Sequence, residues 1–209
     1  QERTLAKDEE DLDAVFRQSV DRSFNSISVD GCMSTNDTAL ILANGFAGNL
    51  EITKRSGALD RFREMLSALL AELARGLVRD GEGATKVIEI TVEEAKTLGD
   101  AKRVAYAVAN SNLVKTAFFG SDPNWGRIIS AVGSVGIDLP VDRVRLFFEG
   151  VPVFAGGKGS LDQEEELAGI MKQTEIRVRI GLGMGRRSWT VCTSDLSFDY
   201  IKINAHYHT

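Results

Sequence analysis

Two glycines flank a single carboxylate in the segment Asp80-Gly81-Glu82-Gly83-Ala84-Thr85-Lys86. Glycine permits positive φ and the close approach of a ligand to the backbone, so a carboxylate on such a turn is suited to hold an ammonium group. The alternative is a helix C-cap whose Glu82 side chain is solvated. The local sequence taken alone favours this alternative, because glycine is common at helix ends.

A second polar group closes the chain and includes Asn204, His206, His208 and Thr209. The two histidines would share one face of an extended segment, but without a third acid or thiol in register they make a weak zinc site, and we predict no metal. A frayed terminus is the plain alternative. However, residues 198–203 have a strand-like pattern, which would anchor the tail and place the terminal carboxylate in a site.

Two further polar loops suggest structural roles. Residues 34–38 could line a polar site, but a network of Asx and Ser/Thr turns is favoured. In residues 120–127, Asp122 or Asn124 would cap the following helix, whose N-terminus suits an anion. The glycine pattern is neither a P-loop nor GxGxxG, so nucleotide binding is not predicted.

Composition bounds the class of protein. The chain has 209 residues, of which 43% are hydrophobic and 26% charged, enough for a globular domain with a real core. The net charge of −5 and the lack of a basic block disfavour nucleic acid as a partner. The longest apolar runs are too short for a membrane span. The acidic first thirteen residues are unlike a secretory or transit peptide.

Cysteine usage points to the compartment. Cys32 and Cys192 lie 160 residues apart and form no CxxC motif. No distant His–Asp arrangement supports a nucleophilic role for either residue, so we interpret them as core or surface thiols. This usage is typical of a reducing environment, and we predict a cytoplasmic protein.

Hydrophobic periodicity predicts the elements that must position these residues. Helical spacing predicts helices over 9–24, 58–79, 127–135 and 160–172, the last with Ser160 as N-cap, and a capping box at Thr91–Glu94 opens another helix to about Asn110. Apolar runs predict strands at 26–29, 38–43, 86–92, 113–119, 144–148, 151–154, 176–180, 188–194 and 198–203.

This alternation of helices and strands, ending in antiparallel-looking strands, predicts a layered α/β domain with a mixed sheet. There is no internal repeat and no convincing linker. We therefore predict a single unit over residues 1–209, with a weak subdivision near 156–160.

Five sequence blocks follow one another in a characteristic order and spacing. They are Asp21-Arg22-Ser23-Phe24-Asn25, Ser34-Thr35-Asn36-Asp37-Thr38, Asp80-Gly81-Glu82-Gly83-Ala84-Thr85-Lys86, Asp122-Pro123-Asn124-Trp125-Gly126-Arg127 and the closing segment from Tyr200 to Thr209. In combination the blocks resemble the bifunctional ornithine/glutamate N-acetyltransferase family of arginine biosynthesis. The resemblance covers nearly the whole chain.

The resemblance implies a β chain, cut from a precursor that cleaves itself before a threonine. It implies an α+β, layered αββα-type architecture with mixed, largely antiparallel sheets, similar to N-terminal-nucleophile hydrolases but distinct from them in topology. The implied partner is the α chain of the same precursor, in an α2β2 heterotetramer. The implied reaction moves an acetyl group from N-acetylornithine to glutamate through an acetyl-threonine. No cofactor is implied, although some members also use acetyl-CoA.

The resemblance also implies site residues. Glu82 matches the family's substrate-binding glutamate, and Asn204 and Thr209 match its C-terminal substrate contacts, which reverses the local preference for a solvated Glu82. The threonine nucleophile, whose own α-amine acts as base, is expected upstream of Gln1. About ten residues of an apolar opening strand are also expected there, and residues 7–13 are charged instead. No catalytic residue is therefore expected within this sequence.

Two other functions stay open at this point. One is a catalytically inactive homologue that binds an amino acid or serves as an assembly subunit. The other is an amidohydrolase resembling the N-terminal-nucleophile enzymes, which would release free acetate without an acceptor.

Overall fold

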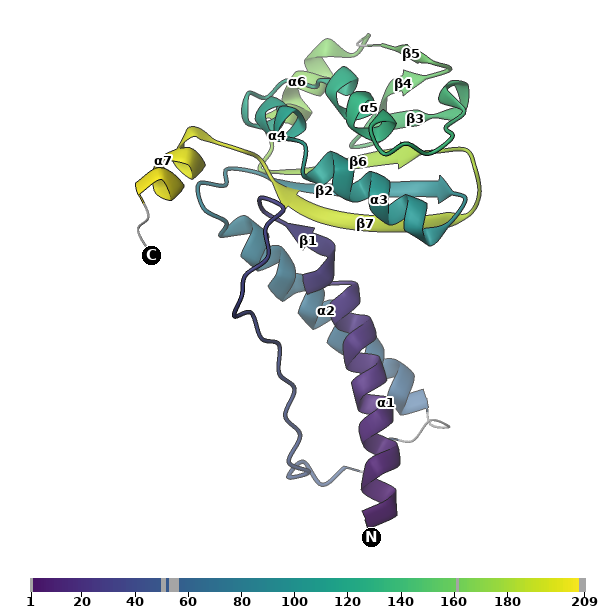
Figure 1. Ribbon diagram of the computed structural model, residues 1–209, viewed down its shortest axis with the longest axis vertical. Coiled ribbons are helices and arrows are strands. Elements are labelled where there is room, and N and C mark those ends of the chain that lie inside the picture. Colours follow the sequence, from purple (N-terminus) through teal and green to yellow (C-terminus); the bar gives the residue numbers. More distant parts are fainter. Residues whose placement is uncertain (1, 50–51, 53–56, 161, 207–209) are drawn as a thin grey trace. The chain divides into compact units, whose positions relative to one another are not determined.

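The computed structural model describes residues 2–49, 52, 57–160 and 162–206 (Figure 1). The chain divides into two compact units. One comprises residues 1–26 and 32–75, and the other comprises residues 27–31 and 76–209. None of the helices in the described part of the chain is both long and apolar enough to cross a membrane.

The first unit contains helix α1 (Glu2–Asp21) and most of helix α2 (Gly57–Arg79), which confirm the helices predicted over 9–24 and 58–79. A hydrogen bond of 2.9 Å between the hydroxyls of Ser19 and Ser67 joins the two helices. The short 3-10 helix η1 (Phe24–Ser26) follows α1 and leads into the second unit. The chain thus passes from the first unit to the second after Ser26 and returns to the first after Gly31.

The second unit is built on a seven-stranded mixed sheet with the strand order β1-β7-β2-β6-β3-β4-β5. Strands β1 and β7, and strands β2 and β6, pair in parallel, and the other four pairs are antiparallel. The strands are β1 (Ile27–Ser28), β2 (Val87–Ala95), β3 (Arg145–Phe148), β4 (Val151–Ala155), β5 (Lys158–Gly159), β6 (Glu175–Gly181) and β7 (Arg187–Ser194). The mixed and largely antiparallel sheet of the prediction is confirmed.

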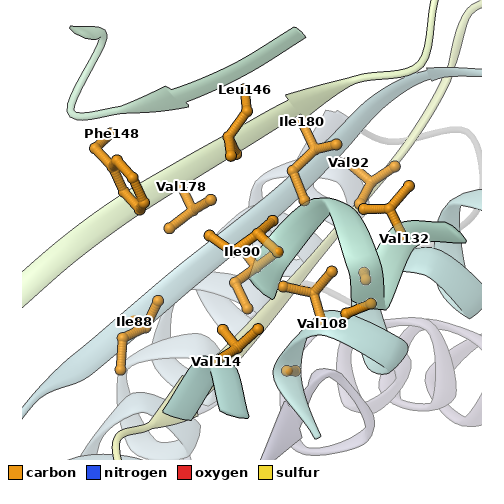
Figure 2. Close-up of a cluster of buried hydrophobic side chains, with 14 of the residues drawn as sticks. Ile88, Ile90, Val92, Val108, Val114, Val132, Leu146, Phe148, Val178 and Ile180 are labelled. Carbon is orange, nitrogen blue, oxygen red and sulfur yellow. The ribbon is translucent and has the colours of Figure 1, made fainter. Parts of the chain in front are cut away.

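One face of this sheet carries the core of the unit. Figure 2 shows Ile90 of β2, Val178 of β6 and Leu146 of β3 among the buried side chains that face Val108 and Val132 of the covering helices. Helix α3 packs on β2 and β7 (Figure 1). The helices of the unit are α3 (Leu98–Ala109), α4 (Asn112–Phe119), α5 (Trp125–Gly133), η2 (Val141–Arg143), α6 (Glu164–Met171) and α7 (Phe198–His206).

The other face of the sheet is polar, because side chains alternate along each strand. Arg179 of β6 lies 3.6 Å from the carboxylate of Glu93 on β2, and the hydroxyls of Thr91 and Thr190 lie 2.9 Å apart. The alternation predicted for residues 176–180 is therefore confirmed. The second sheet of a layered αββα architecture is not among the described residues, and that layer stays an expectation.

Three of the predicted strands are wrong. Residues 113–119 belong to α4, where the hydroxyl of Ser111 caps the first turn, and residues 198–203 belong to α7. Residues 38–43 have an irregular conformation in the described structure. A short apolar run does not distinguish a helix from a strand, and a strand forms only where a neighbouring strand accepts its hydrogen bonds.

Two predicted helix starts are also wrong. Strand β2 continues through the supposed capping box to Ala95, and Thr97 caps α3 instead through a 3.0 Å hydrogen bond from the Asp100 amide. Helix α6 begins at Glu164 rather than after Ser160. Pairing of β2 with strands on both sides outweighs the local capping signal.

Candidate functional site

The glycine-flanked carboxylate lies in the turn between α2 and β2. The Asp80 amide donates to the carbonyl of Gly76 at 2.9 Å and ends the helix, and the Ala84 amide donates to the carbonyl of Gly81 at 2.9 Å. Gly83 has a φ of +66°, and a β-carbon there would lie 2.5 Å from the backbone nitrogen of Tyr200. Glycine is therefore required at position 83, both for its conformation and for the close approach of α7.

Helix α7 is joined to this turn at its first residues. The hydroxyl of Ser197 donates to the carbonyl of Gly83 at 2.6 Å and accepts from the amide of Tyr200 at 3.3 Å. It thus satisfies one of the unpaired N–H groups at the start of α7 while it ties the helix to the turn. Tyr200 is held again by its own hydroxyl, which donates to the carboxylate of Asp30 at 2.9 Å.

Two of the predicted site residues meet at this junction. The side-chain amide of Asn204 donates to Glu82 Oε2 at 2.5 Å and to the carbonyl of Tyr200 at 3.0 Å. The two residues are 122 positions apart in the sequence, and both side chains are exposed. The third predicted residue, Thr209, lies outside the described residues, so the structure joins a carboxylate and an amide but leaves their role as substrate contacts a prediction.

The histidines of the tail do not lie on an extended segment. His206 is in the last turn of α7, which corrects the expectation of a shared strand face, and His208 lies outside the described residues. No group of three metal-ligating side chains is found among the residues that the structure describes.

A buried carboxylate also holds the turn. Asp195, which follows β7 and is 3% exposed, accepts from the amides of Thr85 and Lys86 at 2.8 and 2.9 Å. Its other oxygen accepts from the Thr85 hydroxyl. Because Asp195 is only two residues before Ser197, one segment holds both the turn that carries Glu82 and the helix that carries Asn204.

Two buried lysines lie around this carboxylate. Lys115 of α4 is 3% exposed and donates to the Thr193 hydroxyl at 3.1 Å and to the carbonyl of Ser194. Burial lowers the pKa of Lys115 to about 8, and the negative charges of Asp195 and Asp30 oppose that change.

The second lysine, Lys86, donates to the carbonyls of Phe118 and Met171 at 2.5 and 2.7 Å. Burial also lowers its pKa, and the charge of Asp195 acts in the opposite direction. Both ammonium groups donate to protein oxygens beneath the turn, and these hydrogen bonds offset part of the cost of burying the two charges.

A separate hollow of about 500 Å³ lies at the other end of β2 and shares no residue with this junction. Its lining includes Glu94, Arg143 and Arg145. The Arg145 guanidinium is bound to both oxygens of Glu94 at 2.5 and 2.6 Å, and this hydrogen bonding is the main cause that lowers the pKa of Glu94. We assign no function to this hollow, because its principal charges neutralise each other.

The sequence prediction did not include the residues that hold the site together. Asp195, Ser197 and Lys115 were not singled out as site residues, and the local signal is a run of three polar residues, Thr193-Ser194-Asp195, where a strand ends. The cap of α5, in contrast, is confirmed: the Arg127 amide donates to Asn124 Oδ1 at 3.0 Å.

The fold and the junction together define a class: a mixed α/β protein in which the last helix brings an amide to a carboxylate on a glycine turn. A model of the ArgJ family matches residues 5–209 of this sequence. The chain belongs to the ArgJ family.

Individual relatives agree with this assignment. The arginine biosynthesis bifunctional protein ArgJ of Geobacter sulfurreducens is 52% identical over 209 residues, covering 98% of this chain and 52% of that protein. The protein of the same name from Streptococcus thermophilus is 44% identical over 198 residues, covering 95% and 50%. The chain therefore spans about half the length of the curated relatives that it matches.

A solved structure extends the similarity to three dimensions. The crystal structure of the arginine biosynthesis bifunctional protein argJ from Bacillus halodurans matches with a TM-score of 0.88 at 33% identity. The match covers 94% of this chain and 92% of that chain, so the two chains have nearly the same extent.

Proposed function

We propose that this chain is one half of a glutamate N-acetyltransferase that moves an acetyl group from N-acetylornithine to glutamate in arginine biosynthesis. The observation that carries the proposal is the hydrogen bond between Asn204 and Glu82, which joins the two described residues that match the family's substrate contacts. Membership of the ArgJ family and the names of the relatives support the reaction and the pathway.

The proposed reaction uses substrate-binding residues of this chain and a nucleophile that lies outside it. In the proposal, the hydroxyl of a threonine that precedes this sequence attacks the acetyl carbon of N-acetylornithine. The amide C–N bond breaks, ornithine leaves with the proton, and an acetyl-threonine ester remains. The ammonium of glutamate gives a proton to the α-amine of the threonine, and the resulting amine attacks the ester, which forms N-acetylglutamate and regenerates the threonine hydroxyl. Acetyl-CoA is a second donor to test.

In the proposal, the role of this chain is to bind the amino-acid substrates. Each substrate carries one ammonium group, and the exposed carboxylate of Glu82 pairs with it. Asn204 uses its two N–H bonds on Glu82 and on the carbonyl of Tyr200, which leaves its Oδ1 as an acceptor for the same ammonium. Thr209 completes the proposed contacts.

The proposal includes the partner and the compartment. The relatives are about twice as long as this chain, whereas the solved argJ chain has about the same extent. This difference in length supports two chains cut from one precursor, an α chain and this β chain, assembled as an α2β2 heterotetramer. We place the enzyme in the cytoplasm, in agreement with its cysteine usage: Cys32 and Cys192 lie 160 residues apart and form no CxxC motif.

The test is a transfer assay with the full-length protein. Labelled N-acetylornithine and glutamate should give labelled N-acetylglutamate, and acetate released without glutamate would indicate a hydrolase instead. Glu82→Ala should raise KM for both substrates about tenfold or more, since a hydrogen-bonded charge pair is lost. Asp80→Ala removes an exposed acid two residues away and serves as the matched control. An unchanged KM for both substrates in Glu82→Ala would remove Glu82 from the site.

A further inference from the structure

Helix α2 carries two adjacent rows of apolar side chains, and only one of them is covered. Residues four apart on a helix form a ridge, and neighbouring ridges lie side by side. One ridge contains Leu70 and Ala74, which are 8% and 1% exposed. The adjacent ridge contains Met65, Leu69, Leu73 and Leu77, which are 66%, 54%, 52% and 56% exposed. We call these four residues the open ridge of α2.

Soluble proteins rarely leave a continuous row of large apolar side chains in water. The polar side of α2 lies elsewhere, at residues such as Arg61, Glu64 and Glu72. The open ridge is therefore an apolar contact surface.

The same unit contains an apolar segment of irregular conformation that pairs with no described strand. The sequence Thr38-Ala39-Leu40-Ile41-Leu42-Ala43 has the composition of a buried strand, yet Leu40 and Leu42 are 78% and 91% exposed. The sheet order of the described residues does not include it. A strand of this kind forms when residues outside those described, such as a strand edge of another chain, supply the hydrogen-bonding neighbour.

The length of the relatives identifies the partner. The ArgJ proteins that match this chain extend over about twice its length, so a polypeptide of similar size belongs to the same protein. That half is the natural source of an apolar surface and of a strand edge.

We propose that the open ridge of α2 and the segment Thr38–Ala43 form the docking surface for the other half of the ArgJ protein. In this arrangement residues 38–43 pair as an added strand with a sheet of the other half. The open ridge of α2 packs against apolar side chains of that same half. The inference rests on the division into two chains made under the proposed function.

The test measures association rather than activity. The two halves are co-expressed with an affinity tag on this chain, and the retained other half is quantified by native mass spectrometry. Leu69→Glu places a charge in the centre of the ridge and should reduce the retained half at least about tenfold. Ala71→Glu changes an exposed residue on the opposite side of α2 and should leave it unchanged.

A second measurement uses the unmodified complex, so it does not depend on how a variant folds. Hydrogen exchange should show the amides of residues 39–43 protected at least about a hundredfold, as in a paired strand. Full retention of the other half by Leu69→Glu, or unprotected amides at 39–43, would overturn the inference. A homodimer of this chain that Leu69→Glu dissociates would also overturn it, in favour of a second copy as occupant. Acetyl transfer by the unmodified protein tests the proposed function separately.

Discussion

Replacement of Asp195 should disturb the proposed substrate site, although this buried residue is not one of the proposed substrate contacts. Its carboxylate accepts from the amides of Thr85 and Lys86 and from the Thr85 hydroxyl, and it is 3% exposed. Asp195→Ala therefore removes every acceptor at once and leaves a buried N–H of Lys86 unpaired. Asp195→Asn keeps Oδ1 for the two amides and loses only the charge and one acceptor.

The magnitude follows from these bonds. A buried N–H without a partner costs about 1–3 kcal/mol, and hydrogen bonds to a charged group contribute about 1.5–3 kcal/mol. Asp195→Ala should thus lower the free energy of unfolding by about 2–5 kcal/mol, and Asp195→Asn by about 1–2 kcal/mol. The turn of Glu82 and the start of α7 both lose their support, so KM for both substrates should rise about tenfold in Asp195→Ala.

The assay combines urea unfolding with steady-state kinetics of the full-length protein under conditions where each variant is folded. Asp195→Asn should keep KM for both substrates close to the wild-type value, and a general loss of stability would not explain this difference from Asp195→Ala. If Asp195→Ala is destabilised while KM for both substrates stays at the wild-type value, the positioning role is refuted. Equal damage by Asn and Ala would contradict the importance of the Oδ1 hydrogen bonds.

Two other predictions follow from the same region. Gly83→Ala places a methyl group 2.5 Å from the Tyr200 nitrogen at a φ of +66°, so it should lower stability by at least about 1–2 kcal/mol and raise KM. Gly81→Ala, without a positive φ, should be milder, and equal effects in thermal unfolding would contradict this reasoning. Because burial lowers the pKa of Lys115 to about 8, the unfolded chain binds the extra proton above that pH, and stability should rise with pH between about 8 and 10.5. Urea unfolding measures this as the increase in the free energy of unfolding from pH 7.5 to pH 9.5. The increase should be about 2 kcal/mol smaller in Lys115→Met than in wild type, and equal increases would exclude this account.

The predictions succeeded where a pattern repeats over several turns or strand residues. Helix α2 keeps its apolar spacing over more than twenty residues, and β6 alternates Ile176, Val178 and Ile180 with exposed arginines. In β6 this periodicity reflects one buried face, and in α2 it marks an apolar side of which only part is buried. Both patterns can be recognised from neighbouring residues alone. The prediction failed for residues 113–119 and 198–203, because runs this short satisfy both a helix and a strand and only their packing decides between them.

The sequence by itself determined the residue types at the candidate site: a carboxylate between two glycines, and the asparagine at position 204, whose role as a substrate contact is implied by the family resemblance alone. The tertiary structure decided that the two residues meet, since Glu82 and Asn204 are 122 positions apart in the sequence and come together only when the sheet between them has folded. It also decided that Asp195 and Lys115 are buried beneath the turn. Burial and long-range hydrogen bonds depend on the arrangement of distant elements, and no local pattern encodes them.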